Sequence, residues 1–300
     1  LVLVTLYIDP VRAETIDRFD GVGMLLAGAG VAGLAFGLSV AGLDLLPGPV
    51  VGALIGGGAV AMFAYTLHAR RTPAPVLNFA LFRIPTFRAS VIGGFLFRLG
   101  IGALPFLLPL LLQVGFGLSP LQSGLVTFVS AVGAMGMKTQ AARIINYFGF
   151  RTILVANAVI SAFFLAACAA FTPATPVAVM LATLLVGGFF RSLQFTAINT
   201  LAYADIDARR MSRATSLASV GQQLSLSAGV AVGALVVDLS LNWRGETALT
   251  AADFAPAFLV VAAISATSAF VFARLPADAG AEMSGRKPVT ATETSDQRIG

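Results

Sequence analysis

The sequence predicts an all-α integral membrane protein with about eight transmembrane helices, and three observations support this fold class. First, the chain of 300 residues is 57% hydrophobic and only 11% charged, whereas soluble domains are roughly 25% charged. Second, eight apolar runs are each long enough to cross roughly 30 Å of hydrocarbon as a helix of about 20 residues. Third, the Lys and Arg residues between these runs collect on one side of the predicted membrane.

Each apolar run is expected to be helical, because a helix satisfies its own backbone hydrogen bonds where no water is available. The expected limits are 22–42, 48–68, 89–112, 120–137, 152–172, 176–203, 214–237 and 255–273. Asp20 suits the N-cap of the first helix, and Pro47 and Pro49 suit the start of the second. Outer connections such as 172–176 are short and uncharged, so we expect neighbouring helices to form antiparallel hairpins.

The basic residues also orient the chain in the membrane. Of the 19 Lys and Arg residues, sixteen fall on one side: Arg12, Arg18, Arg70, Arg71, Arg83, Arg88, Lys138, Arg143, Arg151, Arg209, Arg210, Arg213, Arg274, Arg286, Lys287 and Arg298. Only Arg244 lies on the other side, and Arg98 and Arg191 lie inside apolar runs. Because cytoplasmic loops collect Lys and Arg, both ends of the chain are expected in the cytoplasm. The short loops and Arg-rich composition suit a bacterial inner membrane.

Three segments fall outside the predicted spans. Residues 1–20 begin with an apolar stretch too short to cross a membrane, which we interpret as the end of a truncated preceding span followed by a cytoplasmic linker. Residues 69–88 are expected to be a cytoplasmic linker whose segment 76–83 forms a short helix at the membrane interface; an ordinary tight linker is the alternative. Residues 275–300 turn polar and are expected to be a disordered cytoplasmic tail.

Composition also excludes several classes of protein. The net charge of +5 does not indicate nucleic-acid binding, because the basic residues are scattered over short loops and form no basic helix or patch. His68 and Cys168 are the only residues of their kinds, which leaves no His cluster or thiolate set for a metal. No catalytic motif has the context that it needs. We therefore expect the lipid bilayer itself to be a partner of the chain, and we expect no nucleic-acid partner, enzyme activity, cofactor or metal.

Five short segments, taken in order, resemble one family. Residues 18–23 are similar to the FDxxG entry to two extra central helices, and residues 81–88 are similar to the cytoplasmic lead into a second six-helix bundle. Residues 138–151 resemble a degenerate C-terminal copy of a GxLaDRxGRR loop, and residues 187–188 and 222–225 also fit. Over residues 9–275 the sequence resembles the C-terminal portion of a 14-helix drug:proton antiporter of the major facilitator superfamily.

This resemblance implies an arrangement and a function. Residues 21–68 would be two extra transmembrane helices, and residues 89–274 a six-helix C-terminal bundle of two inverted three-helix repeats. The first helix of each repeat would line a central cavity. The chain would be the C-terminal portion of a secondary active transporter, with proton-driven export of drugs or amphipathic metabolites by alternating access. Arg143, Gly149 and Arg151 would form a cytoplasmic gating loop, but Asn146 stands roughly where that loop carries Asp, so no Asp-dependent role is transferred.

Two arginines lie inside the predicted spans. Arg98 follows Arg88 by ten residues, about 15 Å of helix, and Arg191 precedes Tyr203 by twelve residues, about 18 Å. Both therefore fall near the midplane of the hydrocarbon, where an Arg costs about 2.5–3.5 kcal/mol on insertion scales. That depth is too great for the side chains to reach water along a lipid-facing surface, so each is expected to face a cavity or a partner.

We expect the two arginines to share a substrate cavity with neighbouring polar and aromatic side chains. The candidate residues are Arg98, Arg191, Gln194, Asn199, Gln223, Phe97 and Phe190. Two alternatives stand beside this interpretation: the arginines bind carbonyls freed at a Gly/Pro kink, or they pair with carboxylates elsewhere in the protein. The polar side chains have the further alternative of purely structural hydrogen bonds between helices.

All 14 acidic residues fall in loops, tails or span ends. A proton antiporter needs a titratable group within the membrane, and Arg stays protonated at physiological pH, so proton coupling is expected in the missing N-terminal half. A second hypothesis is a non-transporting membrane receptor or scaffold built on the same bundle. In that case, replacing the arginines would destabilise the fold and leave small-molecule binding unchanged.

Overall fold

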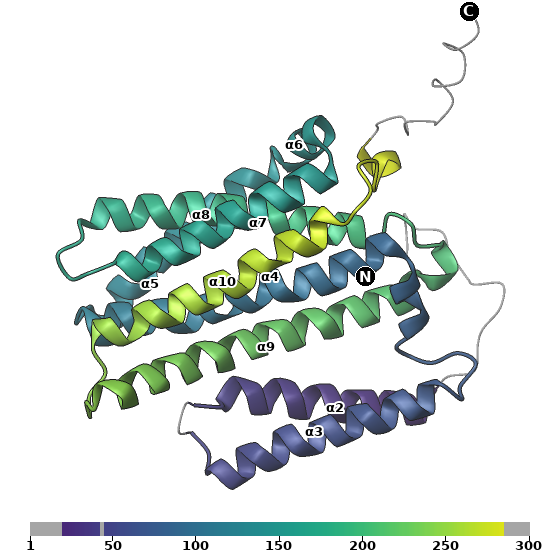
Figure 1. Ribbon diagram of the computed structural model, residues 1–300, viewed down its shortest axis with the longest axis horizontal. Helices are drawn as coiled ribbons and strands as arrows, with labels where there is room; N and C mark the ends of the chain where they lie inside the picture. Colours follow the sequence, from purple (N-terminus) through teal and green to yellow (C-terminus); the bar gives the residue numbers. More distant parts are fainter. Residues whose placement is uncertain (1–19, 43–44, 285–300) are drawn as a thin grey trace, which may run out of the picture.

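The computed structural model describes residues 20–42 and 45–284, and within these ranges every element is helical. Eight of the described helices are long and apolar enough to cross a membrane, which confirms the predicted fold class (Figure 1). Their core segments are α2 (Gly21–Val40), α3 (Gly48–Ala69), α4 (Pro85–Leu110), α5 (Pro120–Lys138), α7 (Phe150–Ala167), α8 (Val177–Ala202), α9 (Met211–Arg244) and α10 (Phe254–Ala273).

Shorter helices join or extend these eight. One is α-helical, α6 (Ala141–Phe148), and one is a π-helix, η2 (Leu111–Gly115), which continues α4. The remaining short elements are 3-10 helices: η1 (Phe79–Arg83), η3 (Cys168–Ala170), η4 (Ala208–Arg210), η5 (Ala251–Asp253) and η6 (Ala281–Ser284).

Local sequence signals explain where several helices begin and how α4 changes. Asp20 accepts a hydrogen bond from the Gly23 backbone N–H at 2.8 Å, as expected of an N-cap. Pro49 lies in the first turn of α3, where its missing N–H leaves no bond unmade. Pro105 and Pro109 lie inside α4, where each removes a backbone donor. The helix then widens into η2, which begins two residues after Pro109.

Six of the helices form a bundle that divides into two similar halves, α4–α5–α7 and α8–α9–α10. The first helix of each half packs on the second helix of the other, as α4 on α9 and α8 on α5. It also packs on the third helix of the other, as α4 on α10 and α8 on α7, while α7 and α10 pack together. This set of pairs is unchanged when the halves are exchanged, as an inverted-repeat bundle requires.

Glycines allow the two crosswise helix pairs to approach closely. A Cβ on Gly188 of α8 would lie 2.1 Å from the Ser130 carbonyl oxygen of α5. Likewise, a Cβ on Gly229 of α9 would lie 2.1 Å from the Leu99 carbonyl oxygen of α4. Neither position has space for a side chain, and small residues are the usual means of close helix packing in membranes.

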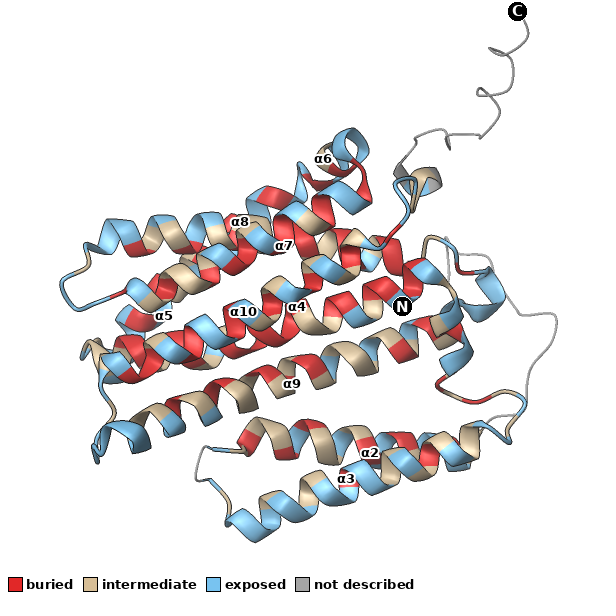
Figure 2. Ribbon diagram, in the orientation of Figure 1, coloured by how far each residue is buried: buried red, intermediate tan, exposed pale blue. Residues whose placement is uncertain are grey.

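The α2–α3 hairpin lies outside this bundle, along α9 (Figure 1). Ser39 of α2 donates a hydrogen bond to Ser227 of α9 at 3.1 Å. Tyr65 of α3 is fully buried, and its hydroxyl bonds both the carbonyl oxygen of Leu77, at 2.9 Å, and its N–H, at 2.6 Å. The predicted linker therefore follows α3 closely, and it contains the short helix η1 within the segment 76–83. Its position at a membrane interface stays a prediction. Much of the surface of α3 is exposed (Figure 2).

The chain stays ordered beyond α10, so the prediction of a disordered tail from residue 275 is wrong for residues 275–284. Leu275 is 4% exposed and belongs to the core around α7 and α8. Gly280 has a φ of 70°, and a Cβ there would lie 2.8 Å from the ring of Phe150. The segment was predicted to be disordered because it is mostly polar, and its composition gave no sign that Leu275 and Gly280 pack against the core. The predictions for residues 1–19 and 285–300 lie outside the described residues.

Candidate functional site

Arg98 lies near the middle of α4, a helix of 26 residues, and is 5% exposed. Its guanidinium donates a hydrogen bond to Asn199 Oδ1 of α8 at 2.7 Å. The guanidinium carbon also lies 5.4 Å from the ring centre of Phe195, within the range of a cation–π contact. A Cβ on Gly94, one turn earlier, would lie 2.6 Å from Arg98 Nη1. Gly94 therefore makes room for the guanidinium.

A cavity of about 40 Å³ adjoins Arg98 between α4, α8 and α9. A water molecule needs about 10–15 Å³, so this cavity has space for a few waters or a small polar group. Arg98 Nε is buried without a hydrogen-bond partner among the described residues, which leaves the guanidinium a free donor. The other polar side chains that line the cavity are Ser90, Asn199, Tyr203, Ser219 and Gln222.

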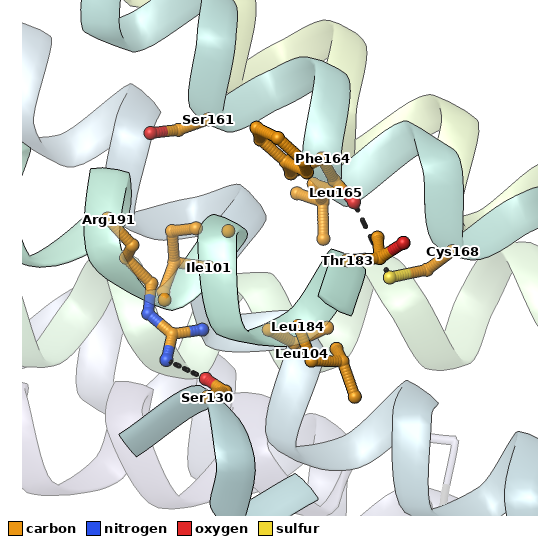
Figure 3. A pocket seen from close by; sticks show the side chains of 12 residues that line it. Ile101, Leu104, Ser130, Ser161, Phe164, Leu165, Cys168, Thr183, Leu184 and Arg191 are labelled. Atoms are coloured by element: carbon orange, nitrogen blue, oxygen red, sulfur yellow. Dashed lines mark hydrogen bonds between the residues drawn. The ribbon is translucent and has the colours of Figure 1, made fainter. Parts of the chain in front are cut away.

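Arg191 occupies the corresponding place in the second half of the bundle, near the middle of the 26-residue helix α8. It donates a hydrogen bond to Ser130 Oγ of α5. In Figure 3 the guanidinium points to Ser130, while Ser161 lies at the opposite edge of the pocket. Ser161 Oγ is buried without a partner among the described residues, and the pocket of about 20 Å³ has space for about one water.

A second hollow adjoins the other side of Arg191. Its volume is about 290 Å³, and its wall includes the proline-bearing face of α4 and part of α5. Pro105 and Pro109 line it together with Thr127 and Ser130. Pro105 and Pro109 of α4 therefore border the same hollow as Arg191, whereas Gly94 of the same helix lies against Arg98.

The two arginines thus line separate cavities. Arg98 lies against α8 and α9, and Arg191 lies against α5 and α7. This division follows the crosswise packing of the two halves of the bundle. Within the described part of the chain, neither arginine forms an ion pair with a carboxylate. Each is instead held by a neutral polar side chain, which leaves its charge uncompensated.

The remaining predicted site residues have different surroundings. Gln194 is fully buried, and its amide nitrogen donates to the Leu154 carbonyl oxygen at 3.0 Å. Phe97 is fully buried and packs edge-on against Phe195. Phe190 stacks on the Phe164 ring at 6.0 Å between centres. Gln223 is exposed, and the neighbouring Gln222 lines the Arg98 cavity instead.

The predicted gating-loop residues lie around α6. Arg143 is exposed on α6, and Arg151 is exposed in the first turn of α7. Gly149 joins these helices with φ 81° and ψ 157°, a backbone conformation that is essentially restricted to glycine. This requirement is a structural reason for Gly149 that does not depend on gating.

Two polar residues of the site escaped the sequence analysis. The first is Ser130, whose hydroxyl accepts a hydrogen bond from Arg191; nothing in the sequence distinguishes it from the other serines of the chain. Asn157 of α7 donates to Gln194 Oε1 at 3.1 Å and to the Phe190 carbonyl oxygen at 2.7 Å, and it is 2% exposed. An Asn inside an apolar span is itself a signal, because polar side chains at that depth are expensive and face the protein interior.

Comparison with known proteins settles the family. The family model of the Major Facilitator Superfamily matches residues 90–295, a range that includes both arginines, most of α4 and the other five bundle helices. The chain belongs to the Major Facilitator Superfamily. It is accordingly a multi-pass membrane protein, as its eight apolar helices indicate.

Individual relatives extend the similarity to the α2–α3 hairpin. The chain is 35% identical over 269 residues to "Putative multidrug resistance protein MdtD" of Salmonella heidelberg (strain SL476), covering 87% of the chain and 56% of the relative. It is 34% identical over 284 residues to the protein of that name in Escherichia coli O139:H28 (strain E24377A / ETEC), covering 92% of the chain and 59% of the relative. The chain therefore spans little more than half the length of these relatives.

Proposed function

We propose that the chain is the C-terminal portion of a secondary active transporter that exports drugs or amphipathic metabolites by alternating access. The observation that carries the proposal is the pair Arg98 and Arg191. Each lies near the middle of the first helix of its half of the bundle, beside a small cavity and without a carboxylate partner among the described residues. Charges at this depth are functional by default. The names of the relatives support drug-like substrates.

In this proposal the arginines bind anionic or strongly polar groups of the substrate, or carboxylates from other parts of the transporter. Arg98 Nε offers an unused donor, and the hollow of about 290 Å³ beside Arg191 has space for part of a ligand. Phe195 adds aromatic surface next to Arg98, and Phe164, on which Phe190 stacks, lines the pocket beside Arg191. Gln194 and Asn157 bond mainly to each other and to backbone, so we assign them to holding α7 and α8 together.

Proton coupling is assigned to residues outside the described part of the chain. The described Asp and Glu residues lie in loops, in short helices or near the ends of long helices, and Asp238 lies furthest inside, six residues before the last residue of α9. Asp253, which is fully buried, is bonded to Thr250 and paired with Arg244 at 3.1 Å. A group that carries protons must become exposed to each side of the membrane in turn. None of the described carboxylates lies deep enough in the membrane to do so. The proposed location is a bacterial inner membrane, with the basic helix ends on the cytoplasmic side.

Export assays on the complete gene product that contains this chain test the function. Proteoliposomes with an imposed pH gradient are loaded with anionic, neutral and cationic dyes, and efflux is compared between wild type, Arg98→Gln, Arg191→Gln and the exposed control Lys138→Gln. We expect both arginine variants to lose export at normal abundance and the control to keep it. Full export by both variants would show that Arg98 and Arg191 have no role in binding substrate. Dye binding without gradient-driven transport would favour the receptor or scaffold.

An accessibility scan tests the orientation. Single cysteines placed in the linker 69–88 are expected to react with a membrane-impermeant reagent only after the cells are opened. Reaction in intact cells would reverse the proposed topology.

A further inference from the structure

An apolar groove of about 420 Å³ lies between α3, α4, α9 and the short helix η1. It shares Val91 and Gly221 with the lining of the Arg98 cavity, but Arg98 and Arg191 are not among its lining residues. Among the described residues that line it, Thr66 alone has a hydroxyl, amide or charged side chain, and the Thr66 hydroxyl already donates to the Phe63 carbonyl oxygen at 2.7 Å. The groove therefore presents hydrocarbon and no unused polar side chain. Representative lining residues are Met62, Phe79, Phe82, Ile92, Phe95 and Leu217.

The groove separates α3 from the bundle. The hairpin contacts α9 mainly through α2, so the face of α3 that carries Met62 and Thr66 meets α4 and α9 across this hollow. A hydrophobic ligand in the groove would touch the hairpin, the linker and the bundle at once. It would bury apolar surface of all three, which stabilises their arrangement.

Cations lie one helical turn beyond the groove on each of the three long helices. Arg70 follows Thr66 by four residues on α3, and Arg88 precedes Ile92 by four residues on α4. Residues four apart lie on the same helix face, so both side chains extend from the groove-lining faces. Arg70 and Arg88 are exposed, as is Arg83, which directly follows Phe82.

On the third helix, Arg213 precedes Leu217 of the groove by four residues. Three carboxylates at this end of the structure have partners among the described residues. Asp20 lies 2.8 Å from His68 Nε2, Asp207 pairs with Arg210, and Asp205 accepts a hydrogen bond from the neutral Thr86 hydroxyl at 2.7 Å. The exposed cations Arg70, Arg83 and Arg88 still outnumber Asp20 and Asp205, so the described residues at the mouth of the groove carry an excess of positive charge.

We propose that the groove holds an acyl chain of an anionic phospholipid whose phosphate is bound by Arg70 and Arg88. The required ligand has a long hydrocarbon part and a negative group at one end, and anionic lipids are the membrane molecules with this chemistry. Basic pockets between transmembrane helices bind such headgroups, and cations near the surface each add to the attraction. The lipid acts as a structural ligand that holds the α2–α3 hairpin on the bundle, and it does not depend on the proposed transport function.

Native mass spectrometry of the complete protein tests the proposal. Detergent-purified protein is equilibrated with equal amounts of dioleoylphosphatidylglycerol and dioleoylphosphatidylcholine, and the retained lipids are counted. The charge variant is Arg70→Gln with Arg88→Gln. Its matched control is Lys138→Gln with Arg143→Gln, which removes the same charge from exposed positions on α5 and α6. A third variant, Ile92→Trp, fills the groove at a position that is 44% exposed and so tolerates a larger side chain.

We expect wild type and the Lys138/Arg143 control to retain one phosphatidylglycerol in preference to phosphatidylcholine. The charge variant should weaken retention of phosphatidylglycerol by about tenfold or more, and Ile92→Trp should abolish it. Equal retention of the two lipids, or the same loss in the control as in the charge variant, would overturn the proposal. So would a wild type that retains neither lipid while Ile92→Trp lowers the unfolding temperature, because another part of the protein would then occupy the groove.

Discussion

Arg98 donates a hydrogen bond to Asn199 across 2.7 Å, and this bond joins the middle of α4 to α8, the first helices of the two halves of the bundle. Arg98 is 5% exposed, so the Asn199 amide oxygen stands in for one of the water molecules that its guanidinium lost on burial. The stability of the bundle and the availability of the cation to a ligand are therefore linked at one side chain.

Removing Asn199 should destabilise the protein more than an ordinary polar deletion does. Asn199→Ala leaves a buried cation short of one acceptor, and a hydrogen bond to a charged group contributes about 1.5–3 kcal/mol. Asn199→Asp keeps an acceptor and adds the opposite charge, so it should preserve stability while neutralising the site. Thermal unfolding of purified protein checks the first effect, and efflux of an anionic dye, expected to fall in Asn199→Asp, checks the second. Unchanged unfolding in Asn199→Ala would show that water replaces the amide.

The packing of α5 on α8 gives a prediction with a control on the same helix. A Cβ on Gly133 would lie 2.0 Å from the Leu185 carbonyl oxygen, whereas a Cβ on Gly136 meets nothing within 4 Å. Gly133→Ala should therefore force the helices apart and destabilise the protein by about 1–3 kcal/mol. Gly136→Ala should be neutral or slightly stabilising, because Ala is the better helix former. Equal unfolding temperatures for the two variants would contradict the close approach.

The sequence predicted the number of membrane helices and their order, because each apolar run is long and bounded by charged or turn-forming residues. Limits were less accurate where polar residues continue a helix. The predicted span 214–237 extends in the structure to α9, Met211–Arg244, since side chains near the membrane surface no longer need to be apolar. The family resemblance predicted two three-helix repeats, but the pairing of α4 with α9 and of α5 with α8 is known only from the structure.

The site was harder to predict than the fold. The depth of Arg98 and Arg191 follows from residue counting, but the directions of their side chains do not. A helix that is apolar all round carries no periodic signal to orient its faces. The separation of the two arginines into different cavities, and their partners Asn199 and Ser130, depend on which helices pack together. A single sequence does not specify that packing side chain by side chain.

Gly149 provides a prediction about the loop between α6 and α7. Its φ of 81° and ψ of 157° are strained for any residue with a Cβ, so Gly149→Ala should cost of order 1–3 kcal/mol. Gly124→Ala is the control, because a Cβ there has open space. Thermal unfolding separates strain from gating. A variant that loses export without losing stability would assign Gly149 to the transport cycle, and one that loses neither would contradict the backbone geometry.

The Asp20–His68 contact predicts a pH dependence of stability. Burial raises the pKa of the Asp20 carboxyl, but hydrogen bonds from His68 and from the Gly23 N–H outweigh it and hold this pKa below its usual value. A carboxyl whose pKa is lower in the folded state stabilises the fold above its unfolded pKa of about 4. This stabilisation is lost as the pH falls through the folded value.

Asp20→Asn isolates this contribution, because Asn still caps α2 but carries no charge. Wild type should unfold at a higher temperature than Asp20→Asn at pH 6, and the difference should shrink steadily as the pH is lowered from about 5 to 3. The measurement is thermal unfolding of detergent-purified protein at each pH, with Lys138→Gln as a control that alters charge at the same end of the structure. A difference between wild type and Asp20→Asn that stays constant over this range would mean that Asp20 acts through its shape as a cap and that its charge contributes nothing to holding α2 against α3.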